Sequence, residues 1–329
     1  MKKIIQILWI FLLLLSFSAC NKTAQVETLN KKLKIVTTFA PLYSFTKNIT
    51  KDLAEVDNLL PIGASVHNWE PTISDIKKIA RADIVIQNGL HLEEFLDKLL
   101  QISENPELIV IDTSEKVNLL KLKEEETDHE KKELESNHHE EKEDESDYNH
   151  EEPDHHHGEF DPHIWLSPER AKTQIQNISK ILEEKDQANT KAFRKNTEEY
   201  IEKITLLQEE IHSNFKNIEK KEFIVFHDAY GYFLEEFELS KYKKASIEAF
   251  PGKKPSPAYM QKIVSLIEKE HVNIIFTEPQ FSPKIVQTLE EELNLQSYEI
   301  NPIGYEISQE GYEKTIKEIS NTFLKAFSQ

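Results

Sequence analysis

The chain of 329 residues carries a net charge of −19, with 59 acidic against 40 basic residues. Residues 124–160 hold seventeen Asp or Glu against three Lys, which is 14 of the 19 net negative charges. The remainder is only mildly acidic, so we expect no basic face and no nucleic-acid partner. The length allows two domains of ordinary size. A single Cys, Cys20, excludes a disulfide framework and any zinc site built from several Cys.

The N-terminal segment has the composition of an export signal. Two Lys precede an apolar run from Ile4 to Phe17, which is too short for a comfortable membrane span. The small residues before Cys20 fit a cleavage site. We therefore expect residues 1–19 to be a signal peptide, and Cys20 to be a lipidated N-terminus followed by a polar tether over 20–31. The mature protein would then be extracytoplasmic and membrane-anchored.

Residues 32–120 alternate short apolar runs with segments of helical spacing. Continuous apolar runs separated by helices indicate a buried parallel sheet, so this region is predicted to be one βα lobe. The strands are expected at 33–38, 56–62, 83–87 and 108–112, and the helices at 40–52, 74–81 and 92–101.

Residues 121–160 form an acidic tract with almost nothing that gains by leaving water, so we expect a disordered loop. Seven of the thirteen His of the chain lie in it. Tracts of His and carboxylates bind metal weakly and in numbers, which favours an accessory, low-affinity metal role over a simple solvated spacer. The seven residues are His129, His138, His139, His150, His155, His156 and His157.

After the tract, residues 161–185 are predicted to be a helical return, and 186–217 a long helix with apolar residues at spacings of three and four. A helix of that length measures about 48 Å, which suits a link between two lobes. The βα alternation then resumes over 218–329. The predicted fold is α/β, with two βα lobes of four-stranded parallel sheets joined by one long rigid helix.

Polar residues at the carboxyl ends of the predicted strands mark the candidate site, because ligands bind there in open parallel sheets. His67 follows the second strand, His227 ends the fifth, and Glu278 ends the seventh. His163 lies between the acidic tract and the next helix. Each His alone fits a hydrogen-bonded structural residue. Together, from both halves of the chain, they indicate a metal site.

Four motifs resemble those of the substrate-binding proteins of zinc and manganese ABC importers, and are closest to the high-affinity zinc uptake branch. They are VHNWEP at 66–71, DPHIWL at 161–166, FHDAYGYF at 226–233 and FTEPQF at 276–281. The resemblance covers essentially the whole mature chain. It implies metal held between the lobes by His67, His163 and His227, and delivery to a permease with its ATPase. It also implies no enzymatic activity.

The resemblance favours Zn²⁺ as the transported ion and makes Mn²⁺ less expected, because imidazole suits zinc whereas manganese prefers oxygen ligands. Some relatives supply a fourth, carboxylate ligand where this chain has Gly304. The fourth ligand therefore stays open among water, Glu278, Glu306 and Glu70. Glu278 is expected instead to orient a ligand His or to pair across the cleft.

Two other functions fit part of the pattern. Three His with an open fourth position also describe a catalytic zinc site of a hydrolase, but no nucleophile elbow or pair of catalytic carboxylates accompanies them. A surface metal sink or adhesin would make the acidic tract itself the functional part. We expect a monomeric binding protein whose zinc is cargo.

Overall fold

The computed structural model describes residues 32–122, 158–248, 255–280 and 283–329. The predicted signal peptide, Cys20, the tether and the seven His of the acidic tract lie outside these ranges. Within them, no helix is both long enough and apolar enough to cross a bilayer.

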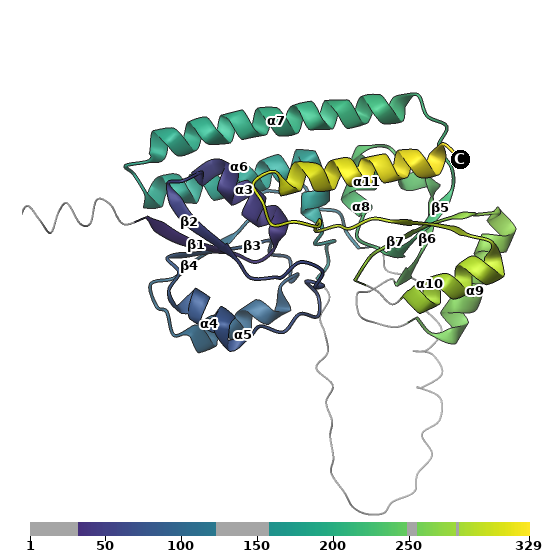
Figure 1. Ribbon diagram of the computed structural model, residues 1–329, viewed down its shortest axis with the longest axis horizontal. Coiled ribbons are helices and arrows are strands. Elements are labelled where there is room, and N and C mark those ends of the chain that lie inside the picture. The colour runs from purple at the N-terminus through teal and green to yellow at the C-terminus, as the bar shows by residue number, and fades with distance from the viewer. Residues whose placement is uncertain (1–31, 123–157, 249–254, 281–282) are drawn as a thin grey trace, which may run out of the picture.

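The first lobe is a parallel sheet in the order β2-β1-β3-β4, with α4 and α5 on one side and α3 on the other (Figure 1). The central strand residues are buried, as the continuous apolar runs require. The elements are β1 (Leu33–Thr37), α3 (Ala40–Thr50), β2 (Ala54–Asn58), α4 (Ile73–Ala80), β3 (Ile84–Gln87), α5 (Glu94–Ser103) and β4 (Ile109–Asp112).

The second lobe repeats this design with a parallel sheet in the order β6-β5-β7-β8. The α/β class and the two four-stranded parallel sheets predicted from the sequence are thus confirmed. The elements are β5 (Phe223–His227), α8 (Gly231–Glu236), the 3₁₀ turn η2 (Ser240–Tyr242), β6 (Lys243–Glu248), α9 (Pro257–Glu270), β7 (Ile274–Thr277), α10 (Pro283–Leu293), β8 (Gln296–Glu299) and α11 (Gly311–Phe327).

Three helices cover the same side of both sheets: α6 (Pro168–Lys185), α7 (Thr190–Lys216) and α11, with α7 passing over both lobes (Figure 1). The short 3₁₀ turn η1 (Ile164–Leu166) precedes α6. The predicted start of the long helix at Asp186 is wrong, because the Asp186 carboxylate accepts hydrogen bonds from the Asn189 backbone and side chain and closes a turn. The 27 residues of α7 make a rod of about 40 Å.

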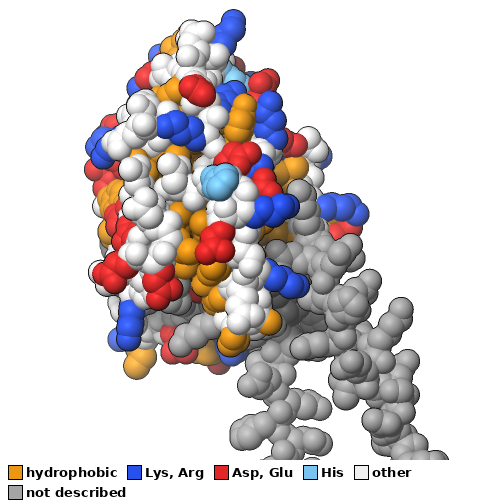
Figure 2. All heavy atoms as spheres, turned by 90° about the vertical axis from the view of Figure 1, so that its right-hand side faces the viewer, with side chains coloured by type: hydrophobic (Ala, Val, Ile, Leu, Met, Phe, Trp, Pro, Cys, Tyr) orange, Lys and Arg blue, Asp and Glu red, His pale blue; other side chains and the backbone are white. Residues whose placement is uncertain are grey.

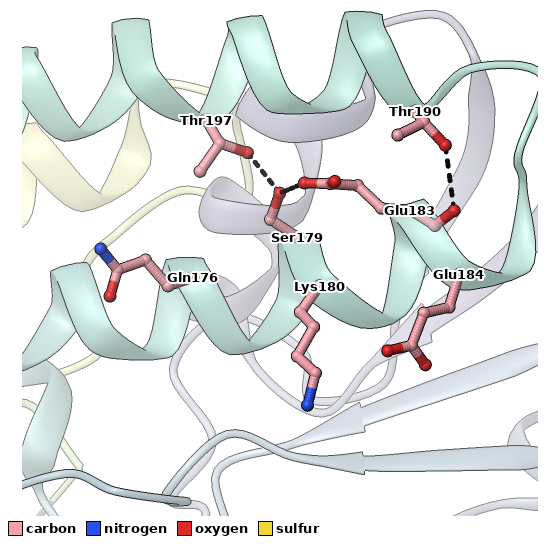
Figure 3. A pocket seen from close by; sticks show the side chains of 7 residues that line it. All are labelled: Gln176, Ser179, Lys180, Glu183, Glu184, Thr190 and Thr197. Atoms are coloured by element: carbon pink, nitrogen blue, oxygen red, sulfur yellow. Dashed lines mark hydrogen bonds between the residues drawn. The ribbon is translucent and has the colours of Figure 1, made fainter.

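The pairing of α6 with α7 is fixed by small polar groups around a shallow pocket (Figure 3). Thr197 Oγ1 donates to Ser179 Oγ at 2.8 Å, and Ser179 Oγ donates to Glu183 Oε1 at 3.1 Å. Thr190 Oγ1 donates to the Glu183 carbonyl at 3.0 Å, beside the turn between the helices. These bonds hold α7 in register on α6.

The lobes share one hydrophobic core that runs from β1 and β3 through α7 and α11 to β5 and β7. They are also joined by polar contacts at the Gln309 carbonyl, just before α11. It accepts from Ser44 Oγ and from Asn48 Nδ2, both on α3 and both at 2.7 Å. The first lobe is therefore tied to the second by side chains as well as by the chain itself.

The ends of the segment 121–160, predicted as disordered throughout, are ordered. Lys121 and Phe160 form an antiparallel bridge, and Lys121 pairs with Glu159. The Leu122 N–H donates to the Glu159 carbonyl at 3.1 Å, and the Asp161 N–H donates to the Leu120 carbonyl at 2.9 Å. We call this short ladder, residues 120–122 with 159–161, the neck.

The outer face of the second lobe carries acidic and basic side chains interspersed with apolar ones (Figure 2). Elsewhere in the second lobe charges are paired, including Lys243 with Asp228 and Lys244 with Glu222. Among the described residues of this face, the two signs of charge alternate, which is unlike the single-sign patch that steers a nucleic acid.

Candidate metal centre

Three His side chains from different elements meet between the lobes. His67 lies in the turn that follows β2, where Gly63 with φ +82° allows the chain to reverse. His163 directly precedes η1, and His227 is the last residue of β5. The two parallel sheets point the carboxyl ends of their strands at each other, so the structure brings these predicted residues together.

The spacing of the three imidazoles fits a metal ion. One ring nitrogen from each lies within 4.8 Å of the others. His67 Nε2 and His163 Nε2 are 3.2 Å apart. Ligand nitrogens of a tetrahedral zinc site, each about 2.05 Å from the ion, lie about 3.3 Å from one another. His163 and His227 are buried, whereas His67 is half-buried.

The Asp161 carboxylate orients His163. Asp161 Oδ1 accepts from the His163 backbone N–H at 2.9 Å and lies 2.7 Å from its Nδ1. Placing the proton on Nδ1 leaves the lone pair on Nε2, which is then the atom able to bind a metal. Burial, together with the neighbouring His227, lowers the pKa of His163 well below its usual value. Burial also raises the pKa of Asp161 to about 7, although the backbone hydrogen bond from His163 opposes this.

Glu278 lies beside His227 as an ion-pair partner, with Oε1 3.2 Å from Nδ1. Both side chains are almost fully buried. Burial alone would lower the pKa of His227, but the adjacent Glu278 carboxylate outweighs it, with help from Asp228 and Asp161, and raises that pKa above its usual value. His163 and His227 thus each have a carboxylate beside Nδ1, so that Nε2 is left for a metal ion.

The structure reduces the number of candidates for a fourth metal ligand. No carboxylate among the described residues joins the three His in a ligand group. Glu70 is exposed, and Glu306 pairs with Lys314 and Ser308. Gly304 has φ +80°, and a Cβ there would lie within 2.1 Å of the Thr315 hydroxyl.

The sequence alone indicates no role for Asp161, although Asp161 is part of the Asp-Pro-His motif. Asp161 acts by orienting the ring of His163, and that orientation cannot be inferred from the spacing of residues in the sequence. An Asp two residues before a candidate ligand is the only available sign, and Asp is common before Pro in ordinary turns.

Replacing Glu278 with Gln should weaken zinc binding at alkaline pH by about 10–100-fold, because His227 loses the carboxylate that fixes its tautomer and ring orientation. Glu313→Gln is the control for the loss of a carboxylate, since Glu313 is half-buried and accepts a hydrogen bond from Tyr200 instead of facing a His. Competition with a chromophoric chelator measures both. Equal affinities for the two variants would contradict the role of Glu278.

The chain is similar to known metal-transport proteins over nearly all of its length. Residues 35–326 match the family described as ZnuA, zinc-uptake complex component A, periplasmic. The chain is 33% identical over 293 residues to the high-affinity zinc uptake system protein ZnuA of Bacillus subtilis, covering 89% of this chain and 85% of that protein. It is 30% identical to the zinc-binding lipoprotein AdcA of Streptococcus pneumoniae, covering 92% of this chain but only 56% of AdcA.

A solved structure agrees with the sequence relatives. The binding protein FpvC of Pseudomonas aeruginosa, in complex with Mn²⁺, superimposes with a TM-score of 0.75 at 28% identity, covering 91% of this chain and 99% of FpvC. The family consists of transport components rather than enzymes, and the resemblance drawn from the four motifs is confirmed. This chain belongs to the ZnuA family of periplasmic zinc-uptake components.

Proposed function

We propose that this protein captures Zn²⁺ between its lobes with His67, His163 and His227 and delivers the ion to an ABC importer. The observation that carries this is the convergence of three ring nitrogens within 4.8 Å, from both lobes, with carboxylates behind two of the rings. An all-imidazole set favours zinc over manganese, which prefers oxygen. The fourth position is then filled by water, which can leave when the ion is handed on.

Membrane attachment belongs to the same proposal. Cys20 carries the lipid, residues 20–31 form the tether, and the ordered protein works as a monomer outside the cytoplasm. Family membership supports an extracytoplasmic site of action, and the AdcA relative is itself described as a lipoprotein. The partner is the permease of the importer together with its ATPase.

The decisive experiment is a competition titration of the purified full-length chain with Zn²⁺ and Mn²⁺, combined with metal analysis. We expect one tight Zn²⁺ per chain that excess Mn²⁺ does not displace. The FpvC structures with Mn²⁺ and Ni²⁺ make this comparison necessary, since a structural neighbour holds other divalent ions. Displacement of zinc by equimolar Mn²⁺ would overturn the assignment of zinc as cargo.

Zinc affinity should fall as the pH falls, starting above the usual His range near 6.5. Metal binding needs neutral imidazoles, so a proton on His227 competes with zinc, and the pKa of His227 is raised. Below that pKa the affinity should drop about tenfold per pH unit, one proton being released per ion. His163 adds little competition, because its pKa is lowered.

The check is a series of competition titrations from about pH 8 to about pH 6. In Glu278→Gln the carboxylate that raises the pKa of His227 is gone, so the loss of affinity should begin at a lower pH than in the wild type. A zinc affinity that stays constant over this range would count against neutral imidazole ligands.

Deleting residues 124–158 should lower the total zinc bound per chain while leaving one tight site. The seven His of the tract supply only weak, accessory binding in this proposal, whereas the tight ligands all lie outside it. Metal analysis at high and low free zinc separates the two classes. Loss of the tight site on deletion would refute its assignment to His67, His163 and His227.

A further inference from the structure

The segment that carries His163 is held in place from both lobes. In the first lobe, Asn88 Nδ2 at the end of β3 donates to the Pro162 carbonyl at 2.8 Å. In the second lobe, the Tyr232 hydroxyl on α8 donates to the Asp161 carbonyl at 2.7 Å. The indole of Trp165 donates to the Pro302 carbonyl at 2.7 Å. Two backbone carbonyls before His163 and the Trp165 side chain after it are thus fixed by partners far away in sequence.

Tyr232 differs from the other partners because its hydroxyl serves both strands of the neck. It accepts from the Leu120 N–H at 3.1 Å while it donates to the Asp161 carbonyl. These two residues stand at the base of the ladder, where Asp161 N–H also donates to the Leu120 carbonyl. One side-chain oxygen therefore closes the base of the neck at the residue whose carboxylate holds His163.

The ring of Tyr232 is itself fixed. It is fully buried, and it packs with Val117 and Ile164 in a small apolar cluster. The Arg170 guanidinium lies over its face, 4.6 Å from the centroid, and Arg170 Nε donates to the Asn118 carbonyl at 2.8 Å. A stacked guanidinium and a packed ring leave the hydroxyl little freedom.

The residue before Tyr232 supports the same arrangement. A Cβ on Gly231 would lie 2.6 Å from Oδ2 of Asp161, so the carboxylate occupies space that only glycine leaves open. Two consecutive residues at the start of α8 thus determine the position of Asp161. Tyr232 binds its carbonyl, and Gly231 leaves room for its carboxylate.

We propose that Tyr232 is a positioning residue for the metal centre: by closing the neck at Asp161 it sets the carboxylate that orients His163. This inference rests on the proposed function, because it assigns His163 as a ligand. Without the hydroxyl, the Leu120 N–H and the Asp161 carbonyl lose a shared buried partner, and the Asp161 backbone is released. The ring of His163 then loses its fixed orientation, and the tight site weakens without losing a ligand.

The test compares Tyr232→Phe with Tyr200→Phe in the full-length chain. Both remove a hydroxyl from a buried ring, but Tyr200 bonds to Glu313 and Ser44 on the far helical side, away from the three His. A second variant, Gly231→Ala, displaces the Asp161 carboxylate and puts a good helix former at the start of α8. Because alanine has a higher helix propensity than glycine, a loss of zinc affinity in this variant cannot be caused by a weakened α8.

Three quantities are measured on each variant: the midpoint of denaturant unfolding, the zinc affinity by chelator competition, and the visible absorption of the protein with one equivalent of Co²⁺. The absorption reports the geometry of the ligands and does not respond to global stability. We expect Tyr232→Phe and Gly231→Ala to weaken zinc binding about tenfold and to alter the Co²⁺ spectrum. Tyr200→Phe should lower the unfolding midpoint but leave affinity and spectrum unchanged.

Two failures are distinguishable. If Tyr232→Phe and Gly231→Ala bind zinc as the wild type does, with its Co²⁺ spectrum, Tyr232 has only a structural role and the inference is wrong. If the wild-type chain itself has no tight zinc site, the proposed function has failed before the variants are considered.

Discussion

Replacing His163 with Ala will lower the affinity of the tight site for zinc by about 10²–10³-fold. Structural zinc sites bind with about 10–16 kcal/mol, so each of four ligands contributes about 2.5–4 kcal/mol, and 1.4 kcal/mol corresponds to a factor of ten. The loss should be near the upper end for His163, because Asp161 is left without its ring partner. Competition titration of the full-length variant gives the number.

The matched control is His212→Ala. His212 is an exposed residue near the C-terminal end of α7 whose ring meets that of Phe237 edge-on, with 4.9 Å between the ring centroids. Alanine suits a helix interior, so this variant should retain the wild-type affinity. His67→Ala and His227→Ala should resemble His163→Ala. Tight zinc binding by the His163→Ala protein would show that the proposed metal centre is wrong.

Replacing Phe323 with Ala should destabilise the protein by about 3–5 kcal/mol, the usual cost of removing a fully buried aromatic side chain. Phe323 lies on α11, is fully buried, and packs on Phe276 at 4.1 Å and on Phe233 at 5.5 Å between ring centroids. It joins α11 to β7 and α8, so the cavity would open at the centre of the second lobe. Denaturant unfolding should show a lower midpoint.

Leu206→Ala is the comparison, because Leu206 is 60% exposed on α7. Its removal should change the unfolding free energy by less than about 0.5 kcal/mol. Zinc affinity of Phe323→Ala, measured well below its unfolding midpoint, should stay within a few fold of the wild type, since no ligand touches this ring. A destabilisation by Phe323→Ala no larger than that by Leu206→Ala would show that the cluster contributes little.

The fold could be predicted from the sequence because its central strands are short, continuous and apolar. Runs such as Ile84–Gln87 and Phe223–His227 are buried in the structure, which is the pattern of strands covered on both faces. The grouping of the three candidate His could be expected as well, because parallel strands bring their carboxyl ends to one edge. The position of His227 at the end of a predicted strand was enough to make it a candidate ligand.

The parts that could not be predicted depend on side-chain direction. The hydroxyl of Tyr232 reaches Leu120, 112 positions earlier, and no local pattern encodes that contact. The start of α7 was misjudged for a related reason. The residues from Asp186 to Asn189 contain neither Gly nor Pro, and only the hydrogen bonds from Asn189 to Asp186 end the helical run. Propensity alone could not separate that turn from a helix.

The neck has a consequence for how such a protein can vary. Leu122 and Glu159 are hydrogen-bonded neighbours, so the two ends of the segment between them lie side by side. Lengthening a segment whose ends are already held together costs only about 0.6 kcal/mol for each doubling. Insertions and deletions beyond the neck can therefore accumulate while the ligands stay in place. A foreign sequence grafted between these two residues would likewise have its two ends held together by the neck.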